Sequence, residues 1–194
     1  MTANAKTLPE GYEKIRDIDL KKNRREALIV NGTSAIIAVA MVLIGHAFVP
    51  VQALFDMSGG AGAYFARFAV IIAGVVVYVV LHEAVHGVVM YHYCRVKPSF
   101  GFTGLYAYAG STAFYNRRSY IVIALAPVVV WGVVLAVLMA LVPKTWFWVA
   151  YFIQLNNLAG AAGDLYVTSL MMKMPEDILV RDAGVSMEVF GKKK

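Results

Sequence analysis

Residues Phe65 to Met90 read FARFAVIIAGVVVYVVLHEAVHGVVM, and this stretch decides the fold. It is longer than the roughly 20 residues that a helix needs to cross about 30 Å of hydrocarbon. Its valine runs would favour a strand in water. Lipid, however, offers backbone groups no hydrogen-bonding partners, so a spanning segment has to satisfy them internally. We therefore predict a transmembrane helix over this stretch.

Three further apolar blocks of similar length lie at residues 27–49, 120–142 and 146–172, so the stretch at 65–90 is the second of four blocks along the chain. The whole chain is 60% hydrophobic and only 15% charged, whereas about a quarter of a soluble domain's residues are charged. The predicted fold class is therefore an all-α membrane protein with four transmembrane helices. We expect a four-helix domain over residues 27–172, a basic tail over 1–26 and a second basic tail over 173–194.

The basic residues are divided unevenly among the segments outside the blocks. Most of them lie in the two tails and in the connection between the second and third blocks, while the rest of the chain offers only Lys144 in a connection and Arg67 at the start of the second block. Basic segments stay on the cytoplasmic side of a membrane, so both termini are expected in the cytoplasm. The net charge of +6 lies beside apolar blocks, which predicts contact with the lipid bilayer and no nucleic-acid partner.

The connection between the second and third blocks is rich in aromatic residues and glycine. Phe100 and Phe102 are two residues apart, as are Tyr106 and Tyr108. Alternation of this kind, interrupted by glycines, is typical of short strands joined by tight turns. We predict a short β-hairpin on the cytoplasmic side. The alternative is an interfacial aromatic belt without regular structure.

The second block contains the pattern H-E-x-x-H, from His82 to His86. Histidines four residues apart lie on one face of a helix, so both imidazoles can reach one ion. Zinc accepts neutral imidazole nitrogens, and Glu83 can act as general base toward a water at the ion. The alternative, two histidines satisfied by hydrogen bonds between helices, would leave Glu83 without a partner in lipid.

A zinc site of this kind needs a third protein ligand. In the pattern H-E-x-x-H-x-x-G-x-x-H, a glycine turns the chain so that the last histidine becomes a ligand. Here that last histidine would be His92, but Val89 stands at the glycine position. On a continuing helix His92 points away from His86. His46 lies at the wrong depth. Asp164 matches the depth of the histidine pair and is the predicted third ligand. The alternative for Asp164 is a hydrogen bond to the neighbouring glycine-rich backbone.

Two asparagines precede Asp164 in a segment of small residues. Small side chains let another helix approach closely, which a metal site shared by two helices requires. Asn156 and Asn157 are amides at an apolar depth, and either one could donate to an oxyanion during peptide hydrolysis. Both are candidate catalytic residues together with Glu83.

The chain resembles the site-2 proteases. That family carries H-E-x-x-H in one transmembrane helix and N-x-x-P-x-x-x-x-D-G in a later one. Asn156 and Asp164 have the family's separation, while Ala159 and Leu165 stand at its proline and glycine positions. Residues 8–12 and 97–101 are similar to a bacterial branch of zincin peptidases of unassigned function. The resemblance implies zinc, intramembrane proteolysis and a location in the bacterial cytoplasmic membrane.

The function predicted from these features is that of an intramembrane zinc metalloprotease acting on a membrane protein or a membrane-anchored peptide. The hairpin residues Phe100, Phe102, Tyr106 and Tyr108 are the predicted substrate-binding residues, because a free strand edge can hold an unwound substrate as an added strand. The alternative is a catalytically silent zinc-binding membrane protein that regulates a partner. A metal transporter and a plain helical scaffold fit the sequence less well, and no oligomeric state follows from it.

Overall fold

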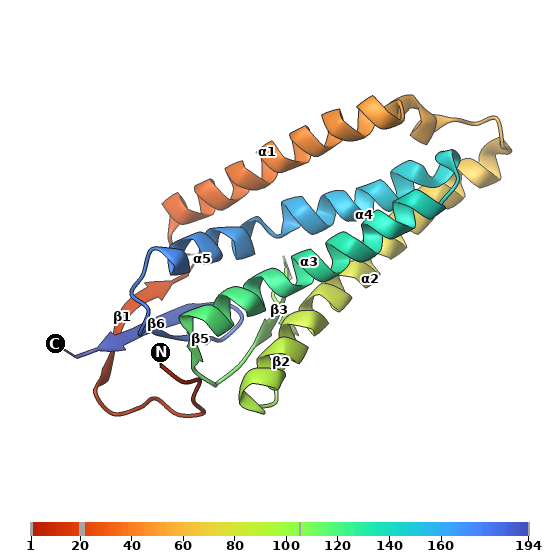
Figure 1. The fold of residues 1–194 in the computed structure, drawn as a ribbon. Helices are drawn as coiled ribbons and strands as arrows, with labels where there is room; N and C mark the ends of the chain where they lie inside the picture. The colour runs from red at the N-terminus through yellow and green to blue at the C-terminus, as the bar shows by residue number, and fades with distance from the viewer. Residues whose placement is uncertain (1, 20–21, 105, 194) are drawn as a thin grey trace. The chain divides into compact units, whose positions relative to one another are not determined.

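The computed structural model describes residues 2–19, 22–104 and 106–193. Its elements are long helices with groups of short strands before, between and after them (Figure 1). The α-helices are α1 (Arg24–Phe48), α2 (Gly60–Cys94), α3 (Arg117–Leu141), α4 (Phe147–Gly160) and α5 (Ala162–Met172). The strands are β1 (Tyr12–Ile18), β2 (Ser99–Phe102), β3 (Ala107–Gly110), β4 (Tyr115–Asn116), β5 (Leu179–Asp182) and β6 (Met187–Lys192). Two 3-10 helices, η1 (Val51–Phe55) and η2 (Lys144–Trp146), precede α2 and α4.

Helices α1, α2 and α3 are long and apolar enough to cross a membrane, with a mean hydropathy of 2.3, 2.3 and 2.9 in their most apolar windows. They confirm three of the four predicted apolar helices. Large apolar side chains such as Ile36, Val76 and Val133 are exposed on these helices. Exposed apolar surface on this scale is unusual for a protein in water and suits contact with lipid.

The fourth apolar block does not form one helix, so the prediction of a continuous helix over residues 146–172 is wrong. Helix α4 ends at Gly160, and α5 begins at Ala162. Between them Ala161 leaves helical geometry, with φ −80° and ψ 13°. Gly160 and Gly163 flank this residue, and glycine lowers helix stability by about 1 kcal/mol relative to alanine. Neither α4 nor α5 reaches the roughly 20 residues of a continuous span.

Two compact units make up the fold, and each is described by itself. The first unit combines the N-terminal segment up to Val30 with Leu81–Pro127 and the segment from Gly163 onward. The second unit consists of Asn31–Val80 and Val128–Ala162. Three separate segments of the chain therefore meet in the first unit.

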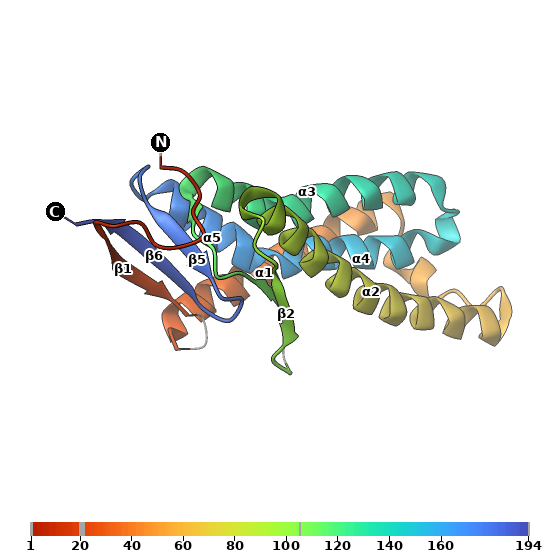
Figure 2. The ribbon, with the colours of Figure 1, turned by 90° about the horizontal axis from the view of Figure 1, so that it is seen from below.

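A four-stranded antiparallel sheet joins the three segments of the first unit, in the order β1-β6-β5-β4. Figure 2 shows β1, β6 and β5 side by side. The all-α prediction is wrong in this respect, because both predicted basic tails contribute strands. The alternation of β1 is interrupted by a bulge between Lys14 and Arg16. A bulge shifts the side-chain alternation by one residue, so β1 lacks the regular pattern that indicates a strand.

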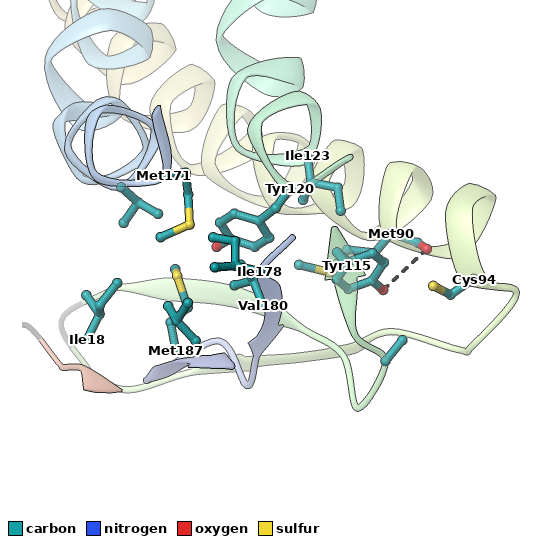
Figure 3. Packing of buried hydrophobic residues seen from close by; sticks show 13 residues of the cluster. Ile18, Met90, Cys94, Tyr115, Tyr120, Ile123, Met171, Ile178, Val180 and Met187 are labelled. Atoms are coloured by element: carbon teal, nitrogen blue, oxygen red, sulfur yellow. Dashed lines mark hydrogen bonds between the residues drawn. The ribbon is translucent and has the colours of Figure 1, made fainter. Parts of the chain in front are cut away.

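The core of the first unit lies between this sheet and the ends of α2, α3 and α5 (Figure 3). Met171 of α5 and Tyr120 of α3 pack beside Val180 of β5, and all three side chains are nearly or fully buried. The Tyr115 hydroxyl donates to the backbone carbonyl of Met90. Burial raises the pKa of Tyr115 to about 12. This core fixes the positions from which the candidate site is built.

Strands β2 and β3 form the predicted hairpin, which is confirmed between residues 99 and 110. Gly104 lies in its turn with φ 88°, a conformation that favours glycine. The Tyr108 ring packs so closely on Gly101 and Gly184 that neither glycine has room for a Cβ. The hairpin is therefore held against the turn that joins β5 and β6.

The second unit is held by polar contacts as well as by apolar packing. The Tyr151 hydroxyl of α4 donates to the Met41 carbonyl of α1 over 2.6 Å. Trp148 donates to the Val49 carbonyl over 3.1 Å and packs in a cluster with Leu54 and Tyr151. Hydrogen bonds between helices are effective in an apolar environment, because neither partner can be satisfied by water there.

Candidate metal centre

Helix α2 carries three of the predicted site residues within a little over one turn. His82 and His86 lie on the same helix face, with ring centroids 4.9 Å apart. Both side chains are buried, at 9% and 8% exposure, and Glu83 between them is partly buried. Because α2 is a continuous helix from Gly60 to Cys94, its regular geometry sets the spacing of the two rings.

Asp164 approaches the histidine pair from the first turn of α5. Its Oδ2 lies 3.4 Å from Nε2 of His82, and its Oδ1 lies 3.6 Å from Nε2 of His86. The break at Ala161 starts a new helix just before Asp164, so the carboxylate stands in a first turn. The predicted third residue therefore does converge with the two histidines, although these residues are about 80 positions apart in sequence.

The spacing and the chemistry of these three side chains fit a zinc ion. Ligand atoms of all three lie within 4.8 Å of one another. Zinc–ligand bonds of about 2.0–2.1 Å in a tetrahedron place the ligand atoms roughly 3.3 Å apart, close to the two histidine–aspartate distances. Two imidazoles and one carboxylate leave a fourth position open, as catalytic zinc sites do.

A hydrogen bond at the second ring nitrogen, Nδ1, fixes the orientation of His86. Its Nδ1 lies 2.9 Å from the backbone carbonyl oxygen of Ile123 in α3. A carbonyl oxygen only accepts hydrogen bonds, so Nδ1 carries the hydrogen and Nε2 faces Asp164. Metal-binding histidines are commonly held in this way by a hydrogen bond from the second ring nitrogen.

Glu83 lies beside the hairpin as well as beside the histidines. Its carboxylate lies near the backbone amide of Ala109 in β3. One turn further along α2, Gly87 contacts the ring of Phe100 and the side chain of Pro98. The hairpin is thus packed on the same segment of α2 that bears the H-E-x-x-H pattern.

The predicted substrate-binding residues of the hairpin differ in exposure. Phe100, Phe102 and Tyr106 are 56%, 70% and 38% exposed. Tyr108 is partly buried against Gly184. The first three present apolar surface that a substrate can contact, whereas Tyr108 packs within the unit. Their role in substrate binding stays a prediction.

The two asparagines belong to the second unit, where their hydrogen bonds differ. Asn157 is fully buried and links three helices: its Nδ2 donates to the Val128 carbonyl and to Gln154, and its Oδ1 accepts from the Tyr78 hydroxyl. Asn156 donates to the Phe152 carbonyl of its own helix. The catalytic role of either amide stays a prediction, and the bonds of Asn157 give it a structural role in addition.

The other two histidines take part in local contacts. The His46 ring accepts a hydrogen bond from the backbone amide of Val51 over 3.1 Å. The His92 ring contacts Tyr93. Neither belongs to the group of His82, His86 and Asp164, which agrees with the sequence-based choice of Asp164.

A second carboxylate in the first unit was not found by sequence reasoning. The Tyr120 hydroxyl donates to Asp182 Oδ2 over 2.5 Å, and the Gly184 amide donates to Oδ1 over 2.8 Å. Burial raises the pKa of Asp182, against the lowering effect of its bond from Tyr120. Asp182 lies outside every apolar block, so no local pattern indicated it.

Comparison with known protein families gives a match. Residues 75–179, more than half of the chain, match the model of a family described as "putative zincin peptidase". The matched segment includes the H-E-x-x-H pattern, the hairpin and Asp164. No curated protein and no solved structure matches the chain.

Proposed function

Because the chain belongs to the family described as "putative zincin peptidase", we propose that it is an intramembrane zinc metalloprotease of the site-2-protease kind. The observation that carries this proposal is the convergence of His82, His86 and Asp164 around one position, with Glu83 beside it. The substrate class proposed is a membrane protein or a membrane-anchored peptide, cut within or near the bilayer.

The residues divide the chemistry among them. A zinc ion held by His82, His86 and Asp164 would polarise the scissile carbonyl and make water a stronger nucleophile at neutral pH. Glu83 takes a proton from the attacking water and passes it to the leaving amine. An amide of Asn156 or Asn157 is the proposed additional donor to the carbonyl oxygen. Of the two, Asn156 is preferred, because both amide hydrogens of Asn157 already have acceptors.

The hairpin offers a specific edge to an unwound substrate. Thr103 N donates to the Tyr106 carbonyl, so these residues form a hydrogen-bonded pair. Bonded and non-bonded pairs alternate in an antiparallel ladder. The pairs Phe102–Ala107 and Phe100–Ala109 are therefore non-bonded, and their backbone groups point away from the hairpin. On β3 these outward groups face the side of Glu83, since the Ala109 amide lies near its carboxylate.

We propose that the substrate pairs with the outer edge of β3. Proline at Ala107 removes an outward N–H without removing a β2–β3 hydrogen bond. Ala107→Ser is the matched control, because it changes the same side chain and keeps the outward N–H. Only Ala107→Pro should lower cleavage, with zinc content unchanged in both variants. Equal effects of the two replacements would assign substrate binding to another surface.

The strand order supports an arrangement in which both termini lie on one side of the membrane. The N-terminal segment, the connection containing β4 and the C-terminal segment all contribute to one sheet. If α1, α2 and α3 each cross the bilayer, the chain has to return to that side through α4 and α5. We propose that the side is cytoplasmic, in a bacterial cytoplasmic membrane, since the basic segments belong to it.

The proposed activity is tested by metal analysis together with a search for cleavage products. Zinc is measured in purified wild-type protein, His82→Ala and His92→Ala; the last replaces a histidine of the same helix outside the group. Wild type and His92→Ala should hold one zinc per chain and His82→Ala much less. Membrane fractions of cells with wild type or Glu83→Gln are then compared for new N-termini.

New N-termini in membrane proteins should depend on Glu83, while Glu83→Gln keeps its zinc. The same products with both proteins would exclude the proposed mechanism. Zinc without any cleavage product would indicate a zinc-binding protein that regulates a partner. Full zinc content in His82→Ala would refute the proposed metal site itself.

A further inference from the structure

Helix α3 contains a proline in its interior, Pro127, and its side chain is fully buried. In a regular helix the N–H of residue 127 donates to the carbonyl of residue 123. Proline has no N–H, so this bond cannot form. The Ile123 carbonyl therefore loses its partner within the helix. In an apolar environment a carbonyl without a partner is costly.

The partner of this carbonyl comes from the candidate metal centre. The Ile123 oxygen lies 2.9 Å from Nδ1 of His86. Ile123 is 1% exposed and His86 is 8% exposed, so water has little access to either group. The hydrogen bond that Pro127 removes from the helix ladder is thus replaced by one from a predicted zinc ligand.

We infer that Pro127 is a positioning residue for the metal centre: it frees the Ile123 carbonyl to hold His86 with Nε2 directed at the metal. This inference rests on the proposed metal site and extends it to a residue 41 positions away from His86 in the chain. The imidazole is held on both sides, by Ile123 through Nδ1 and by Asp164 near Nε2. A ring held in this way cannot turn over to present Nδ1 to the ion.

Proline differs from other residues in two ways, by its missing N–H and by the shape of its ring. The inference depends on the missing N–H. A proline inside a helix also opens the preceding turn, which exposes the freed carbonyl to a side chain of a neighbouring helix. In Pro127→Ala the new N–H competes with His86 for the Ile123 oxygen and closes the turn around it. Alanine is the best helix former, so this variant should fold at least as stably as wild type.

The experiment compares Pro127→Ala with replacement of Pro127 by lactic acid, the ester analogue of alanine. Both lack the proline ring, but only alanine restores an N–H. Zinc affinity is measured by competition with a chelator. Loss of such supporting hydrogen bonds typically weakens metal binding by about 10–100-fold. We expect this loss in Pro127→Ala and near wild-type affinity in the lactic acid protein.

A second measurement needs no metal. Exchange of the His86 Nδ1 hydrogen with solvent is followed by NMR in the metal-free, ¹⁵N-histidine-labelled protein, with the signal assigned by its absence in His86→Asn. The hydrogen should exchange slowly in wild type and in the lactic acid protein, and at least tenfold faster in Pro127→Ala.

Unchanged exchange and affinity in Pro127→Ala would overturn the inference. Equal losses in both replacements would overturn it as well, because the ring and not the missing N–H would then matter. A protein that binds no zinc but shows the expected exchange rates would retain the role of Pro127 and refute the proposed function.

Discussion

The ring of Phe100 lies against Gly87, so that a Cβ on Gly87 would be only 2.8 Å from Phe100 Cε1. Gly87 directly follows His86 in α2. The absence of a side chain there lets the hairpin rest on the helix next to the metal ligands. One glycine thereby sets the distance between the proposed substrate-binding strand and the proposed catalytic residues.

Gly87→Ala should displace the hairpin from α2 and lower cleavage at least tenfold while zinc is retained. Overpacking of a tight contact costs about 1–3 kcal/mol. The matched control is Gly62→Ala in the same helix, where a Cβ meets nothing within 4 Å. That variant should keep its activity. Wild-type cleavage by Gly87→Ala would show that the Phe100 contact does not position the hairpin.

Asn157→Ala should destabilise the protein by about 1–3 kcal/mol, because it removes buried hydrogen bonds to two neighbouring helices. Tyr78 and Val128 are the groups affected. Asn156→Ala loses a bond within its own helix and should change the unfolding free energy by less than about 0.5 kcal/mol. Reversible unfolding in detergent measures both. If Asn156 is catalytic, Asn156→Ala should no longer cleave substrate but should keep its stability. Normal cleavage by this variant would refute a catalytic role of Asn156.

The carboxyl group of Asp182 should make stability depend on pH. Burial raises its pKa in the folded protein, so the native state binds the proton more tightly than the unfolded state does. Its contribution to stability is then complete below the ordinary aspartate pKa and is lost as pH rises through the raised value. Asp182→Asn should flatten the pH dependence of the unfolding free energy over that range. Asp177→Asn, which replaces a half-exposed carboxylate, is the control and should leave the slope unchanged.

Removal of metal should destabilise the first unit. A ligand that binds only the folded state at 100 times its Kd adds about 2.7 kcal/mol of stability. Thermal unfolding should therefore shift upward when zinc is added to chelator-treated protein. Asp164→Ala should abolish the shift and His92→Ala should retain it. A zinc-dependent shift that survives in Asp164→Ala would place the ion elsewhere.

Cysteine labelling in intact cells should test the proposed sidedness. Cys94 is the single cysteine and is buried, so Cys94→Ser provides the background. Cysteines introduced at Lys6, Lys97 and Lys192 should all react from the same side of the membrane, because their segments belong to one unit. A cysteine at Ser58, between α1 and α2, should react from the opposite side. Labelling of Lys6→Cys and Lys192→Cys from different sides would contradict the arrangement.

The sequence predicted the features that depend on local pattern or on the cost of burying charge. H-E-x-x-H fixes His82 and His86 on one helix face by helix geometry alone. Asp164 was identified because an acidic residue inside an apolar block needs a compensating partner. The hairpin was visible from aromatic alternation and glycine. Each of these predictions rests on a rule that acts over a few residues or on one residue's environment.

The features that depend on distant partners were not predictable in the same way. The strands β1 and β6 pair across nearly the whole chain, and the charged residues of β1 gave the appearance of a solvated tail. The break at Ala161 depends on how α4 and α5 pack separately. The position of Pro127 inside an apolar helix indicates a carbonyl without its partner in the helix. Only the fold shows that His86 binds that carbonyl.

Strand β6 lies between β1 and β5, although it is made last of the three. During synthesis β1 leaves the ribosome first and has no neighbour in this sheet until residues 187–192 follow. The sheet that supports the ends of α2, α3 and α5 is therefore completed only after Asp164 has been translated. A nascent chain at an earlier stage therefore lacks both the carboxylate and the complete sheet that supports it.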